Sequence, residues 1–136
     1  MPKVKKRATA KTPTKSYLTN KLDQSCSLIT RSKGRCVKCG EQRYQQLQCC
    51  HIYSRTYKSV RWDLLNLLCM CASCHRWGHN NPCLFTEFVQ TYLGAEQYEE
   101  LKARAEPTSH WKIHEMQELR EANESAMKRL GVWYRK

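Results

Sequence analysis

The residue types that bind metals and move protons are concentrated between positions 36 and 79. This stretch contains two C-x-x-C pairs, at positions 36/39 and 71/74. Thiolates are soft ligands, and four of them form the closed tetrahedral site that is typical of structural zinc. We therefore predict one structural zinc ion bound by Cys36, Cys39, Cys71 and Cys74. Cys69 is close to the second pair, but its spacing to Cys74 does not match C-x-x-C.

The second pair also allows a different interpretation. The run from Cys71 to His75 matches the C-x-x-C-H attachment site of a c-type haem. That chemistry belongs to exported proteins, and the basic N-terminus is not followed by the apolar stretch of a secretory signal. A haem would also leave the pair at 36/39 without a role, so zinc is favoured. Cys26 and Cys83 are expected to be small apolar residues, reduced rather than bridged.

Three histidines and one asparagine in this stretch remain after the zinc ligands are assigned. His75 and His79 project from one face of a helix, so together they can bind a divalent cation with open coordination positions. Such a cation stabilises a scissile phosphate and the departing oxygen. His51 can take a proton from water at neutral pH, and Asn66 is expected to fix the orientation of its imidazole by a hydrogen bond. The set predicts hydrolysis of a phosphodiester bond.

The charge of the chain points to a polyanionic partner. The net charge is +12 over 136 residues, and the excess of Lys and Arg lies before position 80. A nucleic acid, DNA or RNA, is therefore the expected partner. Four cationic side chains are predicted to contact its phosphates: Arg55, Lys58, Arg61 and Arg76. Trp62 and Trp77 are expected to pack beside the zinc site, with stacking against bases as the alternative.

Three regions must position these residues. Residues 1–25 are basic and poor in large apolar side chains, which predicts a flexible arm that lies along phosphates. Residues 26–83 are expected to form the core, with short strands and turns, an extended segment at 45–54 and a short helix at 72–79. Residues 84–136 are expected to be a helical extension.

Within the extension, residues 84–105 are predicted to be helical with a break at Gly94, because their apolar residues recur every three to four positions. A last helix is expected from about residue 110, capped by Thr108 or Ser109 and ended by Gly131. His110 and His114 are expected on its surface. The fold class is α+β, without a transmembrane helix, and a cytoplasmic location is expected.

At this point the chain resembles the HNH endonucleases. The run NLLCMCASCH, residues 66–75, fits the family pattern N-L-x-x-x-C-x-x-C-H, with a histidine upstream at position 51. More narrowly, HIYSR at 51–55 and RWDLLN at 61–66 are similar to the G-H-[YF]-x-S-R and R-[FW]-D-x-x-N segments of phage recombination nucleases of the Rap/NinG type. The resemblance covers about residues 36–100.

The resemblance implies a ββα-metal core with a four-cysteine zinc site. It implies His51 as general base, Asn66 as its orienting partner, and His75 and His79 as ligands of a catalytic Mg²⁺, Mn²⁺ or Zn²⁺. Many family members have an aspartate, a metal ligand, directly before the base. Here that residue is Cys50, which either is a ligand that favours a soft ion or is simply buried.

The implied function is a metal-dependent DNA endonuclease, acting on branched or recombination intermediates of phage DNA in the host cytoplasm. The C-terminal helices at 84–136 would pack on the core or form a homodimer or a DNA clasp. A non-catalytic zinc-ribbon protein, such as a regulator or packaging adaptor, explains the cysteines and the charge but not the histidines. A ribonuclease would use the same chemistry on RNA.

Overall fold

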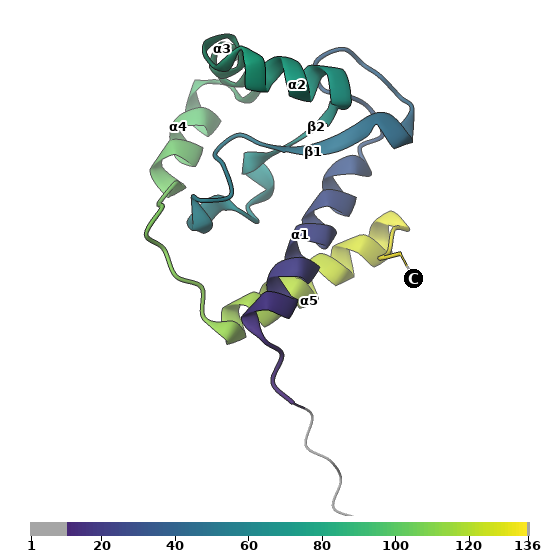
Figure 1. The fold of residues 1–136 in the computed structure, drawn as a ribbon, viewed down its shortest axis with the longest axis vertical. Helices are drawn as coiled ribbons and strands as arrows, with labels where there is room; N and C mark the ends of the chain where they lie inside the picture. The colour runs from purple at the N-terminus through teal and green to yellow at the C-terminus, as the bar shows by residue number, and fades with distance from the viewer. Residues whose placement is uncertain (1–10, 136) are drawn as a thin grey trace, which may run out of the picture.

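The computed structural model describes residues 11–135 and combines helices with a small antiparallel sheet (Figure 1). This mixture confirms the predicted α+β class. In chain order the elements are α1 (Lys15–Arg31), β1 (Leu47–His51), β2 (Leu67–Cys71), α2 (Ala72–Asn80), α3 (Pro82–Leu93), α4 (Ala95–Arg104) and α5 (Ile113–Leu130). Single turns of 3-10 helix lie in the connections at Tyr44–Gln46, Lys58–Val60 and Leu64–Asn66.

The centre of the fold is a hairpin that leads directly into a helix. β1 and β2 pair antiparallel, with Leu47 opposite Cys71 and His51 opposite Leu67. Every residue of β2 is buried, so the strand is apolar along its whole length. α2 starts at the next residue, where the Sγ atom of Cys71 accepts a hydrogen bond from the backbone N–H of Cys74 at 3.5 Å. The geometry of the hairpin therefore sets the position of α2.

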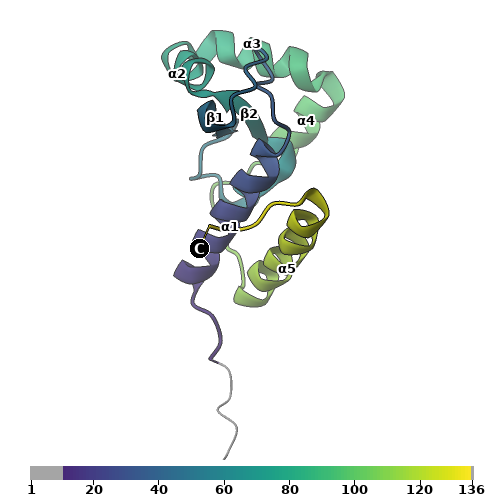
Figure 2. The same cartoon turned by 90° about the vertical axis from the view of Figure 1, so that its right-hand side faces the viewer.

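The hairpin lies between two helical layers (Figures 1 and 2). On one side are α2 and α3, and Leu68 and Val89 belong to the buried cluster there. On the other side α1 packs against both strands, and Leu22 and Leu67 belong to a second buried cluster. Leu67 and Leu68 point into different clusters because successive side chains of a strand face opposite ways. The sheet is thus covered on both faces.

Helix α1 corrects the prediction of a flexible arm over residues 1–25. The chain is helical from Lys15, and Oγ1 of Thr14 caps the helix by accepting a hydrogen bond from the N–H of Tyr17 at 3.1 Å. A narrow stripe of buried side chains at i, i+4 spacing holds the helix in place: Leu18, Leu22 and Cys26. Because the residues around this stripe are mostly polar, the composition of residues 1–25 does not reveal the helix. The part of the predicted arm at residues 1–10 lies outside the described residues.

The C-terminal helices largely follow the prediction. α3 and α4 are separated at Gly94, and α5 ends at Gly131, where φ is +72° in the left-handed region. The predicted cap at Thr108 or Ser109 is wrong, because α5 starts only after Lys112. The indole N–H of Trp111 donates to the carbonyl of Lys58 at 2.8 Å, which holds this residue outside the helix.

Helix α5 packs on α1 rather than on the hairpin (Figure 2). Asn123 is buried in this contact, and its Nδ2 donates to Oγ of Ser25 at 3.0 Å. A buried polar pair with its hydrogen bond satisfied favours one position of α5 along α1. Among the described helices, none is both long and apolar enough to cross a membrane.

Candidate functional site

The four cysteines of the two C-x-x-C pairs lie together. Their Sγ atoms are all within 4.8 Å of one another, and those of Cys39 and Cys71 are 3.6 Å apart. Zinc–sulfur bonds of about 2.3 Å in a tetrahedron place sulfur atoms about 3.8 Å apart. The geometry therefore fits one tetrahedral metal ion, and four thiolates favour zinc. The prediction of a four-cysteine metal site is confirmed at this level.

The turn that carries the first pair is built for thiolates. The N–H of Gly40 donates to the carbonyl of Cys36 at 3.0 Å, and the N–H of Val37 donates to the carbonyl of Cys69 at 2.9 Å. Burial opposes ionisation of Cys36, but backbone N–H groups around its sulfur lower the pKa of this thiol to about 6. Cys69 is fully buried outside the four-sulfur cluster, so it anchors the turn through its backbone. Cys26 is buried as expected, whereas Cys83 is exposed.

An open cleft of about 530 Å³ lies next to the hairpin, between the end of β1 and helices α2 and α3. His51, Arg55, His75 and His79 all line it, together with Phe85 and Thr86 from α3. We call it the histidine cleft. The fold thus brings together His51 and the two histidines of α2, which are far apart in the chain.

His75 and His79 lie side by side on α2, with their rings tilted toward each other. Their Nε2 atoms are 3.2 Å apart. Two imidazoles bound to one zinc ion at about 2.0–2.1 Å would place their nitrogens about 3.3–3.4 Å apart. Oε1 of Gln48 lies 2.8 Å from Nδ1 of His75 and can only accept, so Nδ1 carries the proton and Nε2 the lone pair. Such an outer partner is typical of metal-binding histidines.

Gln48 was not predicted as a site residue. It lies on β1 two positions before Cys50, and the alternation of a strand places both side chains on the face that looks toward α2. This alternation, applied to β1, is the signal that would have found it.

His51 is half-buried at the end of β1 and is held by a backbone group. Its Nε2 lies 3.2 Å from the carbonyl oxygen of Arg61. Because a carbonyl only accepts, Nε2 carries the proton and the lone pair is on Nδ1. Burial lowers the pKa of His51 below its ordinary value, and the positive charge of Arg55 lowers it further. The ring is therefore neutral at pH 7 and able to accept a proton.

Asn66 does not play the role that was predicted for it. Its side chain is fully buried, and its Oδ1 accepts from the N–H of Tyr53 at 2.7 Å. Its Nδ2 donates to the carbonyls of Tyr53 and Val60 at 3.0 and 3.1 Å. These bonds use both N–H donors of the amide and one lone pair of its oxygen, so Asn66 holds the loop 52–66 instead of bonding to the imidazole of His51.

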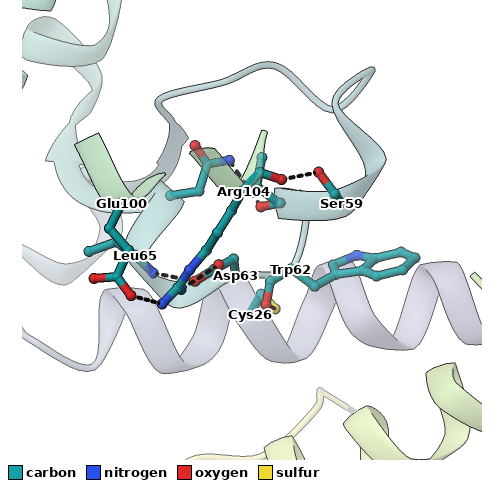
Figure 3. Close-up of polar contacts among 9 residues, drawn as sticks. Cys26, Ser59, Trp62, Asp63, Leu65, Glu100 and Arg104 are labelled. Atoms are coloured by element: carbon teal, nitrogen blue, oxygen red, sulfur yellow. Dashed lines mark hydrogen bonds and ion pairs between the residues drawn. The ribbon is translucent and has the colours of Figure 1, made fainter. Parts of the chain in front are cut away.

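The loop 52–66 is also fixed from the outside by α4 (Figure 3). The guanidinium of Arg104 pairs with the carboxylate of Asp63 at 2.9 Å. The backbone carbonyl of Arg104 accepts a hydrogen bond from Oγ of Ser59 at 2.6 Å. The Sγ atom of Cys26, on α1, lies 3.8 Å from the carbonyl of Trp62. The carbonyl of Arg61 that contacts His51 therefore belongs to a segment with anchors on two helices.

Cys50 packs as a core residue. It is 4% exposed, and burial raises the pKa of its thiol to about 12. Within residues 11–135, no third His, Cys, Asp or Glu joins His75 and His79 in a set of three ligands. Of the two readings of Cys50, the structure thus favours a buried residue over a metal ligand.

The predicted phosphate-binding residues have different environments. Arg55 is exposed and lines the histidine cleft. Arg61 is engaged in two hydrogen bonds with Asp23, at 3.1 and 2.7 Å, and so links the loop to α1 instead of facing solvent. Lys58 and Arg76 are exposed but do not line this cleft.

The two tryptophans were predicted to pack beside the zinc site, and only one does. The ammonium of Lys38, in the cysteine turn, lies 4.3 Å from the ring centre of Trp77. Trp62 is instead buried against α1, where its indole N–H donates to Asp23 at 2.8 Å. The buried ring of Trp62 is therefore not presented for base stacking, whereas Trp77 is partly exposed.

Comparisons of the chain with models of protein families, with curated proteins and with solved structures each gave no match.

Proposed function

We propose that this protein is a metal-dependent DNA endonuclease of the HNH type. The observation that carries the proposal is the convergence of His51 with His75 and His79 on one cleft. The order hairpin, then helix, with a four-cysteine cluster beside them, is the arrangement that the resemblance implies. The concentration of positive charge in the first part of the chain supports a nucleic-acid substrate.

In the proposed reaction, Nδ1 of His51 takes a proton from a water molecule, whose oxygen attacks the phosphorus. The bond from phosphorus to the 3′ oxygen breaks, and that oxygen leaves with the bonding electron pair and takes a proton from solvent. The guanidinium of Arg55 neutralises charge on the phosphate. His75 and His79 would hold a divalent cation, which would supply Lewis-acid stabilisation of the phosphate and the leaving oxygen.

A second function has one observation in its favour. Among the described residues, the four cysteines are the only complete set of ligands for a metal. A zinc-ribbon protein that binds nucleic acid without cutting it needs no more than this set. Metal content distinguishes the two: the nuclease binds a second, exchangeable ion that is lost in His79→Ala, and the zinc-ribbon protein binds one tight ion only.

The direct test is the nicking of supercoiled plasmid in Mg²⁺, Mn²⁺ or Zn²⁺. We expect His51→Ala to lower the rate at least about 100-fold, the usual contribution of a general base, with zinc content and melting temperature unchanged. His114→Ala is the matched control, because His114 is exposed on α5 away from the cleft. Cutting by His51→Ala at the wild-type rate would refute the mechanism, and no cutting by wild type in any of the metals would refute the function.

The finer substrate follows from the resemblance. We propose that branched recombination intermediates are cut in preference to linear duplex. Competition between a four-way junction, a linear duplex and a double-stranded RNA of equal length tests this and separates a ribonuclease. Equal cleavage of junction and linear duplex would remove the branched-substrate proposal but leave the nuclease.

A further inference from the structure

A second cleft opens on the α1 side of His51. It has a volume of about 240 Å³ and lies between α1, β1 and the loop 52–66. We call it the α1 cleft. Cys49, His51 and Arg55 line both this cleft and the histidine cleft. The proposed general base therefore stands where two neighbouring hollows meet.

The α1 cleft carries positive charge that the protein itself leaves uncompensated. Arg31, in the last turn of α1, and Arg55 line it, and the one acid in its lining is Asp23. Both carboxylate oxygens of Asp23 accept hydrogen bonds from Arg61, so this acid is already neutralised. Within residues 11–135, Arg31 and Arg55 form no ion pair with an acidic residue.

The guanidinium of Arg31 is held in a defined orientation. Its Nε donates to the Oγ and the carbonyl oxygen of Ser27 at 3.0 and 3.3 Å, and its central carbon lies 5.3 Å from the ring centre of Tyr44. In the described part of the chain, its two terminal amino groups have no protein acceptor. A guanidinium fixed in this way, with free donors, suits a phosphate group.

We propose that the α1 cleft binds the phosphate next to the scissile one on the cut strand, with Arg31 as its main ligand. This inference rests on the proposed nuclease function and adds a substrate subsite to it. A strand that crosses His51 places one phosphate in the histidine cleft and its neighbour in the α1 cleft, with Arg55 between them. Arg31 comes from α1, which lies outside residues 36–100, the part of the chain that the resemblance covers.

Binding tests the subsite without any need for cleavage. In the His51→Ala background, fluorescence anisotropy of labelled duplex DNA is measured as a function of salt. We expect Arg31→Gln to weaken binding about five- to tenfold at low salt and to reduce the slope of log K against log salt by about one. Arg31→Lys, which keeps the charge but loses bidentate geometry, should restore part of the affinity. Melting temperature and zinc content establish that each variant folds.

Lys33→Gln is the matched control, because Lys33 is exposed just beyond α1, carries the same charge and lines neither cleft. An effect of Arg31→Gln no larger than that of Lys33→Gln overturns the proposal. Arg55→Gln, at an exposed position, is a second variant that tests the cleft without touching α1. It should weaken binding as Arg31→Gln does.

Cleavage then locates the phosphate. A single neutral methylphosphonate next to the cleavage position should slow the wild type as much as Arg31→Gln slows cutting of normal DNA. The two changes together should be no worse than either alone, because they remove the same contact. Additive effects would contradict the assignment. DNA binding that depends on Arg31 without nicking refutes the nuclease, whereas nicking with unchanged binding in Arg31→Gln refutes only the subsite.

Discussion

The carbonyl oxygen of Arg61 lies 3.2 Å from Nε2 of His51, and this contact selects the tautomer of the imidazole. Because the carbonyl holds the proton on Nε2, the lone pair must lie on Nδ1. The guanidinium of the same arginine is tied to Asp23 on α1. Arg61, in the loop 52–66, therefore connects the proposed base to helix α1.

The first prediction concerns pH. Burial and Arg55 lower the pKa of His51, so the neutral base persists below the ordinary histidine pKa of about 6.5. We expect kcat/KM for nicking to fall only as the pH drops below about 6.5. Arg55→Gln removes a positive charge that disfavours imidazolium, so the acid limb should move to higher pH in addition to any loss of rate. An acid limb that stays in place in Arg55→Gln would show that Arg55 does not act on His51.

The second prediction concerns the zinc ion. Structural zinc contributes about 10–16 kcal/mol to folding of small zinc domains at neutral pH. We expect a strong chelator, or Cys74→Ser, to abolish the hairpin–α2 unit, with loss of one zinc per chain by elemental analysis and loss of cooperative thermal unfolding. Cys83→Ser, at an exposed cysteine outside the cluster, is the control and should retain both. A cooperative fold after complete zinc removal would contradict the prediction.

The third prediction concerns Gln48, the outer partner of His75. Gln48→Ala frees Nδ1 of His75, so the ring can turn or change tautomer. Loss of such a partner typically weakens metal affinity about 10- to 100-fold. The metal concentration for half-maximal nicking should rise accordingly, while the tightly bound zinc stays. Gln45→Ala, at an exposed residue before β1, should leave this concentration unchanged.

The fourth prediction concerns Asn66. Asn66→Ala leaves the N–H and the carbonyl of Tyr53 without their partner, whereas the carbonyl of Val60 keeps its bond from the N–H of Asp63. Unsatisfied buried groups of this kind cost about 1–3 kcal/mol each, so we expect unfolding in urea to become easier by at least about 2 kcal/mol. Activity should fall through movement of the loop 52–66. Unchanged stability with lost activity would instead indicate direct contact with substrate.

The parts that the sequence predicted well depend on local spacing. Within each cysteine pair, and between His75 and His79, turn and helix geometry places residues three or four apart close together. The break at Gly94 and the end of α5 at Gly131 are local too. Each of these features needs only a few neighbouring residues to be recognised.

The parts that were missed depend on distant partners. Arg61 was expected to face phosphate, but it meets Asp23 from a helix that was itself not predicted. That helix was concealed because only Leu18, Leu22 and Cys26 mark its buried side. The partners of Asn66 are backbone atoms of a folded loop, and no pattern of side chains in the sequence predicts them. The environment of Arg31 likewise exists only once α1 packs against β1.

The position of His75 directly after Cys74 links the two proposed metal sites. Cys74 of the four-cysteine cluster and the two histidines share one short helix, so loss of the predicted zinc is expected to disturb the proposed second metal site as well. If the protein is the proposed nuclease, its cutting would therefore depend on zinc supply even when the divalent cation of the histidine pair is plentiful.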